Sequence, residues 1–322
     1  MDNATKKPLV SIVVPFFNEE PGIPLFERGI APVLASLPAY DFEIVCVDDG
    51  SCDGTLAMLH TIASRDPRYV VLGLSRNFGK EAALTAGIDH AQGDAVIPID
   101  ADLQDPPEVI ADLLARWRSG AEVVVAQRSD RSTDSYLKRK TAELFYQVHN
   151  RLSEIDIPPN VGDFRLMDRV AVDALKTLPE RQRFMKGLFA WVGFRTDTVT
   201  YSRRPRSAGQ SKFCGLRLWN FALDGITSFS TLPLRVWSYL GGIGALVSFC
   251  YGIFILIRTL VMGADVPGYA SLLAAVLFIG SLQLISIGIL GEYVGRIYME
   301  SKQRPTYIIR SHTKPGLPTG TP

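Results

Sequence analysis

Two aspartates separated by one residue end an apolar stretch of the sequence, which reads IPIDAD at residues 97–102. Side chains two positions apart on an extended backbone share a face, so we predict that the carboxylates of Asp100 and Asp102 point the same way. Carboxylate oxygens suit a hard divalent cation such as Mg²⁺ or Mn²⁺, which can bind a diphosphate. The alternative for this DXD motif is a solvated turn between a strand and a helix, because so short a motif also occurs by chance.

The residues after this pair have the pattern of a helix start. Asp105 stands where an N-cap residue would, Pro106 follows at the first helical position, and Glu108 comes three residues after the cap. We therefore interpret Asp105 and Glu108 as structural residues.

An alternation of apolar strands and amphipathic helices is expected to position the acidic pair. Strands are predicted at residues 9–14, 42–47, 69–74, 95–99 and 122–126, and helices at 24–37, 54–64, 79–92 and 107–118. Repeated βα units of this kind predict an α/β domain, with a mainly parallel sheet covered by helices on both faces. Ligands of such sheets bind outside the carboxyl ends of the strands.

Polar residues follow each of the first four predicted strands, and the carboxyl ends of those strands meet at one edge of the sheet. The candidates are Pro15, Asn18, Glu19, Asp48, Asp49, Asn77, Lys80, Asp100 and Asp102. Together they suit a nucleotide, with acids for the base or ribose hydroxyls and Lys80 as a supporting charge, although each segment alone could be an ordinary turn. The chain has neither GxGxxG after the first strand nor GxxxxGK[ST], so a diphosphate bridged by metal is the preferred interpretation.

Two long runs in the C-terminal third carry no charged residue, at 236–257 and 266–291. Each exceeds the roughly 20 helical residues needed to cross a bilayer, and neither has the polar face of a soluble helix, so we predict two membrane spans rather than buried core helices. The link at 259–265 lacks Lys and Arg, whereas the outer flanks carry several, including Arg235 and Arg296. This distribution predicts that both ends are cytoplasmic. The polar start of the chain lacks the apolar core of a signal peptide.

The predicted organisation has five parts. They are a cytoplasmic catalytic domain at 1–212, a juxtamembrane interfacial helix at 213–233, membrane helices at 234–258 and 266–295, and a cytoplasmic tail at 296–322. A basic amphipathic helix near 135–152 either lies at the membrane interface or packs as an ordinary surface helix.

Composition excludes several other classes of protein. The formal net charge of the 322 residues is +1, which argues against bulk nucleic-acid binding. The four cysteines make no CxxC spacing, so neither a zinc site nor a disulfide is indicated. The four histidines are likewise scattered without ligand spacing.

Several motifs together resemble glycosyltransferase family 2. They are VPFFNE at 14–19, VDDGS at 47–51, NFGK at 77–80 and DADLQDPPE at 100–108. The runs GDFRLMDR at 162–169 and RFMKGLFAWVG at 183–193, with the two spans, look like the polyprenyl-phosphate glycosyltransferases, which include bactoprenol glucosyltransferases and relatives of dolichol-phosphate mannose synthase. The resemblance covers roughly residues 10–305.

The resemblance implies a glycosyltransferase-A-type domain that transfers a hexose, expected to be glucose, from a UDP-sugar to polyprenyl (undecaprenyl) phosphate with inversion. It further implies Mg²⁺ or Mn²⁺ as cofactor and a homo-oligomer, expected to be a tetramer. By the same resemblance, Asp48 and Asp49 bind the base and ribose, and Asp100, Asp102 and Gln104 hold the metal and donor. Pro15, Glu19, Asn77 and Lys80 complete the donor site, and Arg128, Lys138, Arg206, Ser211 and Lys212 bind phosphate. Asp163 orients the acceptor or sugar, is a vestigial base, or forms an ion pair with Arg165 or Arg169.

The basic, glycine-containing loop at 203–212 suits capture of an acceptor phosphate, because Arg and Lys both bind phosphate oxygens. Its alternative role is simple attraction to anionic lipid. A phosphate monoester is already largely dianionic near pH 7, so such an acceptor needs no strong general base.

Two other functions remain as alternatives. A processive polysaccharide synthase would normally show a QxxRW motif and more spans, and neither is present. A catalytically inactive, nucleotide-sugar-sensing membrane scaffold should lack the acidic pair or the basic loop, and this chain has both.

Overall fold

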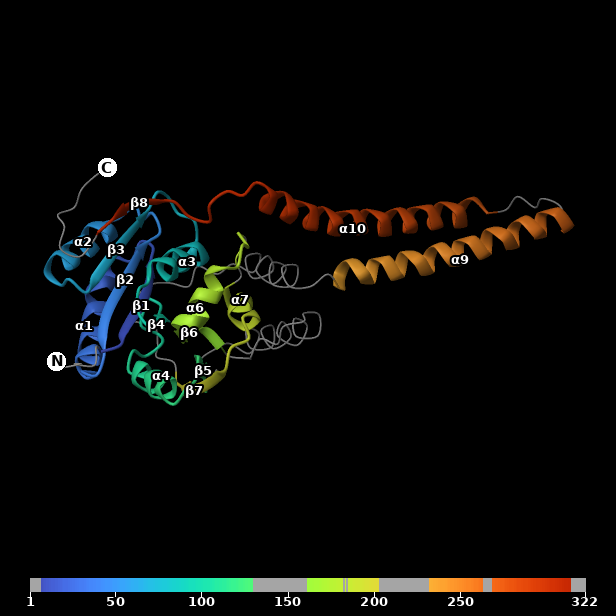
Figure 1. Ribbon diagram of the computed structural model, residues 1–322. Coiled ribbons are helices and arrows are strands. Elements are labelled where there is room, and N and C mark those ends of the chain that lie inside the picture. Colours follow the sequence, from blue (N-terminus) through green and yellow to red (C-terminus); the bar gives the residue numbers. More distant parts are fainter. Residues whose placement is uncertain are drawn as a thin grey trace.

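The computed structural model describes residues 7–129, 161–181, 183, 185–202, 232–262 and 268–313. Within these residues, helices cover both faces of a mixed sheet, and a long two-helix hairpin extends away from it (Figure 1). The strands are β1 (Leu9–Phe16), β2 (Asp41–Asp48), β3 (Tyr69–Leu74), β4 (Ala95–Pro98), β5 (Val123–Arg128), β6 (Val161–Asp168), β7 (Thr196–Tyr201) and β8 (Ile309–His312). The helices are the short η1 (Glu20–Gly22), then α1 (Ile23–Ala35), α2 (Thr55–Arg65), α3 (Lys80–His90), α4 (Val109–Arg118), α6 (Arg169–Lys176), α7 (Met185–Trp191), α9 (Leu232–Met262) and α10 (Tyr269–Ser301).

The first half of the domain follows the predicted βα repeat. Strands β4, β1, β2 and β3 lie side by side and are all parallel. Side chains of β1 alternate between the two faces, with Ile12 in the core beneath α1, α2 and α4, and Val13 in the core beneath α3, α6 and α7. The predicted three-layer α/β architecture is confirmed.

The second half departs from a purely parallel order. Strand β6 lies between β4 and β5 and is antiparallel to both, while β7 extends the sheet in parallel with β5. The predicted strand at 122–126 exists as β5, but it is not the neighbour of β4. Strand order depends on pairings between distant segments, which the local pattern of apolar residues does not specify.

Two local predictions at the end of β4 are wrong. The strand ends at Pro98, so Asp100 and Asp102 lie in the following turn rather than on extended backbone. Helix α4 begins at Val109 after Glu108, and Asp105 is not its N-cap. Asp105 is instead buried and accepts a hydrogen bond of 2.5 Å from the hydroxyl of Tyr201.

The hairpin of α9 and α10 exposes large apolar side chains along its length. Examples are Phe249 and Phe278, both 67% exposed, Leu260 at 78% and Leu284 at 72%. In the part of the chain that the structure describes, Phe278–Ser301 is long and apolar enough to cross a membrane, and Tyr239–Tyr251 is a shorter apolar helical stretch. The predicted span at 234–258 falls within α9, and most of the span at 266–295 falls within α10.

The segment after α10 returns to the catalytic domain. Strand β8 pairs antiparallel with the outer strand β3, placing it at the end of the sheet (Figure 1). Ser75 N donates to Ile308 O and Thr313 N to Val71 O, both at 2.9 Å. This part of the predicted tail is therefore a strand of the sheet. The predicted helices near 135–152 and at 213–233 lie outside the described residues, apart from the start of α9.

Candidate active site

The loops after β1 and β2 are joined by hydrogen bonds at the carboxyl edge of the sheet. Asn18 N donates to Ser51 Oγ, and Cys52 N donates back to Asn18 Oδ1, both at 2.9 Å. Asn18 has a φ of 52°, a conformation that asparagine tolerates better than most residues. The predicted donor residues Pro15 and Glu19 flank this junction on the β1 side, and Glu19 N donates to Thr55 Oγ1 at 3.0 Å.

Asp49 fixes the loop after β3. Its buried carboxylate accepts hydrogen bonds from Phe78 N at 2.7 Å and Gly79 N at 2.9 Å. Burial raises its pKa, although these two bonds oppose the change. Asp49 thus holds the segment that contains Asn77 and leads into Lys80, the first residue of α3.

Gly50 permits the same close approach of the two loops. Its φ is +67°, and a Cβ there would lie 2.3 Å from the carbonyl carbon of Arg76 and 2.6 Å from Asn77 N. No other residue fits without moving the backbone.

Asp48 differs from Asp49 because one of its oxygens lacks a partner. Oδ2 accepts a hydrogen bond of 3.2 Å from Ser51 N, whereas Oδ1 is buried without a hydrogen-bond partner in the described structure. Burial raises the Asp48 pKa. An unsatisfied buried oxygen is costly, so Oδ1 is a ready acceptor for an N–H or O–H group of a ligand.

Lys80 joins two carboxylates that are far apart in the sequence. Its Nζ lies 2.7 Å from Asp100 Oδ1 and 2.8 Å from Asp163 Oδ2. Burial alone would lower the Lys80 pKa, but these carboxylates raise it above its ordinary value. Burial would raise the pKa of Asp163, yet Lys80 and Lys186 together lower it. Both groups are therefore charged at neutral pH.

The alternative partners of Asp163 are occupied elsewhere. Arg165 Nη2 donates to Gly162 O at 2.8 Å, and its guanidinium lies 4.0 Å from the ring centroid of Phe189. Arg165 acts on Asp163 through its charge only, and burial lowers its own pKa to about 10. The observed ion pair of Asp163 is with Lys80.

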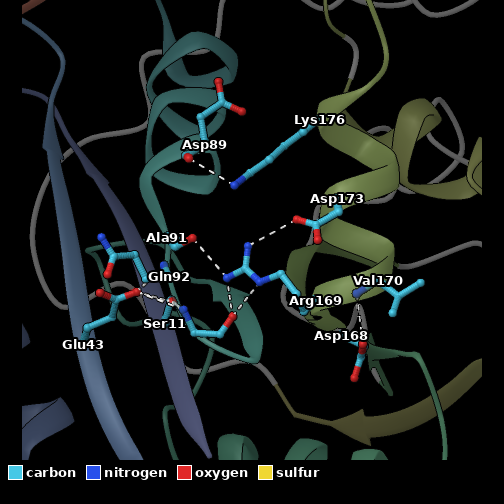
Figure 2. Close-up of polar contacts among 11 residues, drawn as sticks. Ser11, Glu43, Asp89, Ala91, Gln92, Asp168, Arg169, Val170, Asp173 and Lys176 are labelled. Atoms are coloured by element: carbon cyan, nitrogen blue, oxygen red, sulfur yellow. Dashed lines mark hydrogen bonds and ion pairs between the residues drawn. The ribbon is translucent and has the colours of Figure 1, made fainter.

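Arg169 belongs to a different cluster (Figure 2). It donates hydrogen bonds to Ala91 O and Gly93 O and forms an ion pair of 3.6 Å with Asp173. Glu43 is nearby and accepts from Gln92 N at 2.6 Å. These residues connect the segment before β4 with α6, so an ion pair between Arg169 and Asp163 is not part of this structure.

Two charged residues at the site were not among the predicted site residues. Glu81 Oε2 accepts a hydrogen bond of 3.2 Å from Met185 N, and burial together with the charge of Asp163 raises the Glu81 pKa to about 7. Lys186, on α7, contributes positive charge to both Glu81 and Asp163. The run at 183–193 drew attention to Lys186 only as part of a motif, and Glu81 carried no sequence signal.

Asp100, Asp102 and Gln104 provide an oxygen donor set in one tight turn. Leu103 has a φ of 50°, and Gln104 N donates to Asp102 Oδ1 at 3.2 Å. Among the described residues there is no group of three or more His, Cys, Asp or Glu side chains that could hold a metal ion. Two carboxylates and an amide oxygen still fit Mg²⁺ or Mn²⁺, because such ions commonly take their remaining ligands from substrate phosphates and water.

Arg128 is held at the end of β5, near Asp163. Its Nη2 lies 3.7 Å from Asp105 Oδ1, and its Nε donates to the hydroxyl of Tyr201 at 3.3 Å. A Cβ added at Gly162 would lie 3.2 Å from Arg128 Nη2, which places the guanidinium beside the residue preceding Asp163. Burial alone would lower the Arg128 pKa, but Asp105 and Tyr201 together have the larger effect and raise it above its ordinary value. The other predicted phosphate-binding residues, Lys138, Arg206, Ser211 and Lys212, lie outside the described residues.

Comparison with known proteins identifies the family of this chain. The profile described as glycosyl transferase family 2 matches residues 11–176, more than half of the chain. The chain belongs to glycosyltransferase family 2. A second profile, described as the GtrB C-terminal hairpin, matches residues 232–297.

Several relatives match the glycosyltransferase along nearly its whole length. The bactoprenol glucosyl transferase of Shigella phage SfV is 58% identical over 94% of this chain and 98% of that protein. The prophage bactoprenol glucosyl transferase homolog of Escherichia coli K12 is 54% identical over 94% and 98%. Among solved structures, glucosyl-3-phosphoglycerate synthase from Mycobacterium tuberculosis, in complex with Mn²⁺, UDP-glucose and phosphoglyceric acid, matches with a TM-score of 0.46 and 20% identity over 68% of this chain and 78% of that chain.

The family profile and the two bactoprenol relatives confirm the predicted family and enzyme class. The matching hairpin profile and the exposed apolar surface of α9 and α10 make the protein a membrane-associated glycosyltransferase.

Proposed function

We propose that this glycosyltransferase transfers glucose from UDP-glucose to a polyprenyl phosphate, such as undecaprenyl phosphate, at the cytoplasmic face of the membrane. The observation that carries the proposal is one chain that combines the Lys80, Asp100 and Asp163 cluster with an exposed apolar hairpin. The high identity to proteins named bactoprenol glucosyl transferase, over almost their full length, supports both the sugar and the acceptor.

The donor would bind along the carboxyl edge of the sheet. Asp48 Oδ1, which is buried without a hydrogen-bond partner in the described structure, would accept a hydrogen bond from the base or ribose, and Asp49 keeps the neighbouring loop in position. Asp100, Asp102 and Gln104 would hold Mg²⁺ or Mn²⁺, which stabilises negative charge on the departing diphosphate. Lys80 supplies a second positive charge beside Asp100.

The acceptor needs positioning more than activation. Its phosphate carries about −1.5 to −2 charges near pH 7, so its oxygen attacks the anomeric carbon without a strong general base, and inversion follows from attack opposite the leaving diphosphate. Asp163 is held ionised by Lys80 and would orient the acceptor or the sugar. Arg128, Lys138, Arg206, Ser211 and Lys212 would bind the phosphates.

We infer that α9 and α10 each cross the bilayer, with both termini cytoplasmic, and that the enzyme is a homo-oligomer, with a tetramer expected. A Cβ built at Gly291 or Gly295 of α10 would meet nothing within 4 Å in the described structure. This small-residue pair therefore offers an open face for close helix packing between copies.

The test is transfer of radiolabel from a panel of UDP- and GDP-sugars to undecaprenyl phosphate by the purified, detergent-solubilised protein. A mild-acid-labile lipid product formed from UDP-glucose and abolished by EDTA supports the proposal. Transfer of label from a different donor would show that the enzyme uses a sugar other than glucose. Nucleotide-sugar binding without any lipid product, under saturating Mn²⁺ and lipid phosphate, would instead favour the inactive sensing scaffold.

A further inference from the structure

The end of α10 and the residues just after it are bound to the catalytic domain by two hydrogen bonds. Arg181 N donates to the side chain of Glu300 at 2.9 Å, and Arg181 Nε donates to the carbonyl of Arg304 at 2.9 Å. The side chain of Glu300 thus binds the backbone of Arg181, and the side chain of Arg181 binds the backbone of Arg304. We call this pair of bonds the clasp.

The segment after the clasp is held by the far end of α3. The hydroxyl of Tyr307 donates to Asp89 Oδ2 at 3.0 Å, and its ring lies 6.3 Å, between centroids, from that of His90. Strand β8 then pairs with β3, with Leu72 opposite His312. Because Lys80 begins the helix that His90 ends, these contacts hold the same helix that reaches Asp100 and Asp163.

The clasp also connects to the site through α7. Arg181 lies four residues before Met185, the first residue of α7, whose backbone N–H binds Glu81. The next residue, Lys186, contributes to the low pKa of Asp163. The residues at and just after the end of the apolar hairpin are therefore bound to α3 and to the segment that leads into α7, the two helices that place charged groups around Asp163.

We propose that Glu300, Arg181 and Tyr307 are positioning residues for transfer to a membrane-held acceptor. By fixing the end of the hairpin against α3 and the segment that leads into α7, they set the distance and angle between the bilayer and the reacting groups. Orientation of this kind lowers the barrier to a reaction between two bound partners. The inference rests on the proposed lipid acceptor.

Glu300→Ala and Glu300→Gln form the matched pair that tests the clasp, because glutamine keeps the acceptor oxygen for Arg181 N and alanine does not. Tyr307→Phe is a second, independent variant that removes only a hydroxyl. Glu292→Ala is the control, since Glu292 forms its 3.0 Å ion pair with Arg296 within α10. Each protein is assayed in nanodiscs with undecaprenyl phosphate, and in detergent with a short, water-soluble isoprenyl phosphate.

Glu300→Ala and Tyr307→Phe are each expected to lower kcat/KM for the membrane-held acceptor by about five-fold, the effect of one hydrogen bond. Binding of UDP-glucose and the rate with the soluble acceptor should stay within about two-fold of wild type, as should every readout for Glu300→Gln and Glu292→Ala. Equal losses with both acceptors, or equal behaviour of the alanine and glutamine variants, would overturn the inference. Failure of the wild-type protein to use any lipid phosphate would instead refute the proposed function.

Discussion

Replacing Glu81 with glutamine tests how charge is balanced around Asp163. Glu81 is the second residue of α3 and accepts a hydrogen bond from Met185 N. Burial and the charge of Asp163 raise its pKa from 4.5 to about 7. Glutamine keeps an oxygen for Met185 N but removes the titrating proton. The variant therefore isolates the electrostatic contribution of one carboxylate.

The direction in which stability changes with pH follows from the raised pKa of Glu81 in the folded state. Between pH 4.5 and about 7 the folded protein binds more protons at Glu81 than the unfolded chain does, so its stability falls as the pH rises through this window. Above pH 7 the folded protein bears the full free-energy cost of an ionised Glu81, and below pH 4.5 it bears none of this cost. Each pKa unit corresponds to about 1.4 kcal/mol, which gives an upper value of about 3 kcal/mol for the cost removed by glutamine.

Thermal unfolding of the detergent-solubilised protein at pH 5 and pH 8 measures this difference. We expect Glu81→Gln to raise Tm by several degrees at pH 8 and by much less at pH 5. Glu180→Gln, at an exposed position, is the control and should change Tm little at either pH. If Glu81→Gln shifts Tm equally at both pH values, burial of a titrating Glu81 is not the cause and the reasoning fails.

Four further substitutions, one of which is a control, test the loops, the metal and the acceptor. Gly50→Ala should greatly lower the yield of folded protein, because its Cβ would overlap the backbone of Arg76. The control Gly79→Ala meets no atom within 4 Å and should cost about 1–3 kcal/mol in denaturation experiments, the strain of placing alanine at φ +99° and ψ 158°. Asp102→Asn should lower turnover by about 10²-fold at saturating Mg²⁺ or Mn²⁺, and near-normal turnover would refute a metal role. Arg206→Ala should weaken use of the lipid phosphate more than binding of UDP-sugar, and equal losses would assign Arg206 to the donor site.

The sequence predicted well those features that depend on local pattern. Strands β1 to β4 and helices α1 to α4 lie within a few residues of their predicted positions, because apolar periodicity and turn residues act over short distances. The convergence of the strand ends also followed from the parallel order. Lys80 was expected to be a supporting charge near the acidic pair, and it contacts Asp100 directly.

The features that were missed depend on contacts between distant segments. Asp105 has a good N-cap pattern, yet Tyr201, 96 residues away, binds its carboxylate and leaves it buried. The partner of Asp163 was similarly sought among the arginines nearby in sequence, whereas Lys80 is 83 residues away. Neither pairing leaves a signal in a single sequence, because nothing local distinguishes a carboxylate that will meet a distant hydroxyl or ammonium group.

The pairing of β8 with β3 limits how many times the chain can cross the bilayer between them, which the distribution of charged residues does not. The hairpin begins after the catalytic domain, and the segment that follows α10 returns to pair with β3 of the same domain. A chain that crossed the bilayer only once between these points would leave β8 on the opposite side from β3, where Leu72 could not pair with His312. Two crossings, or none, are the choices compatible with the sheet. The exposed apolar side chains along both helices favour two, which is the arrangement that Arg235 and Arg296 at the outer flanks independently predict.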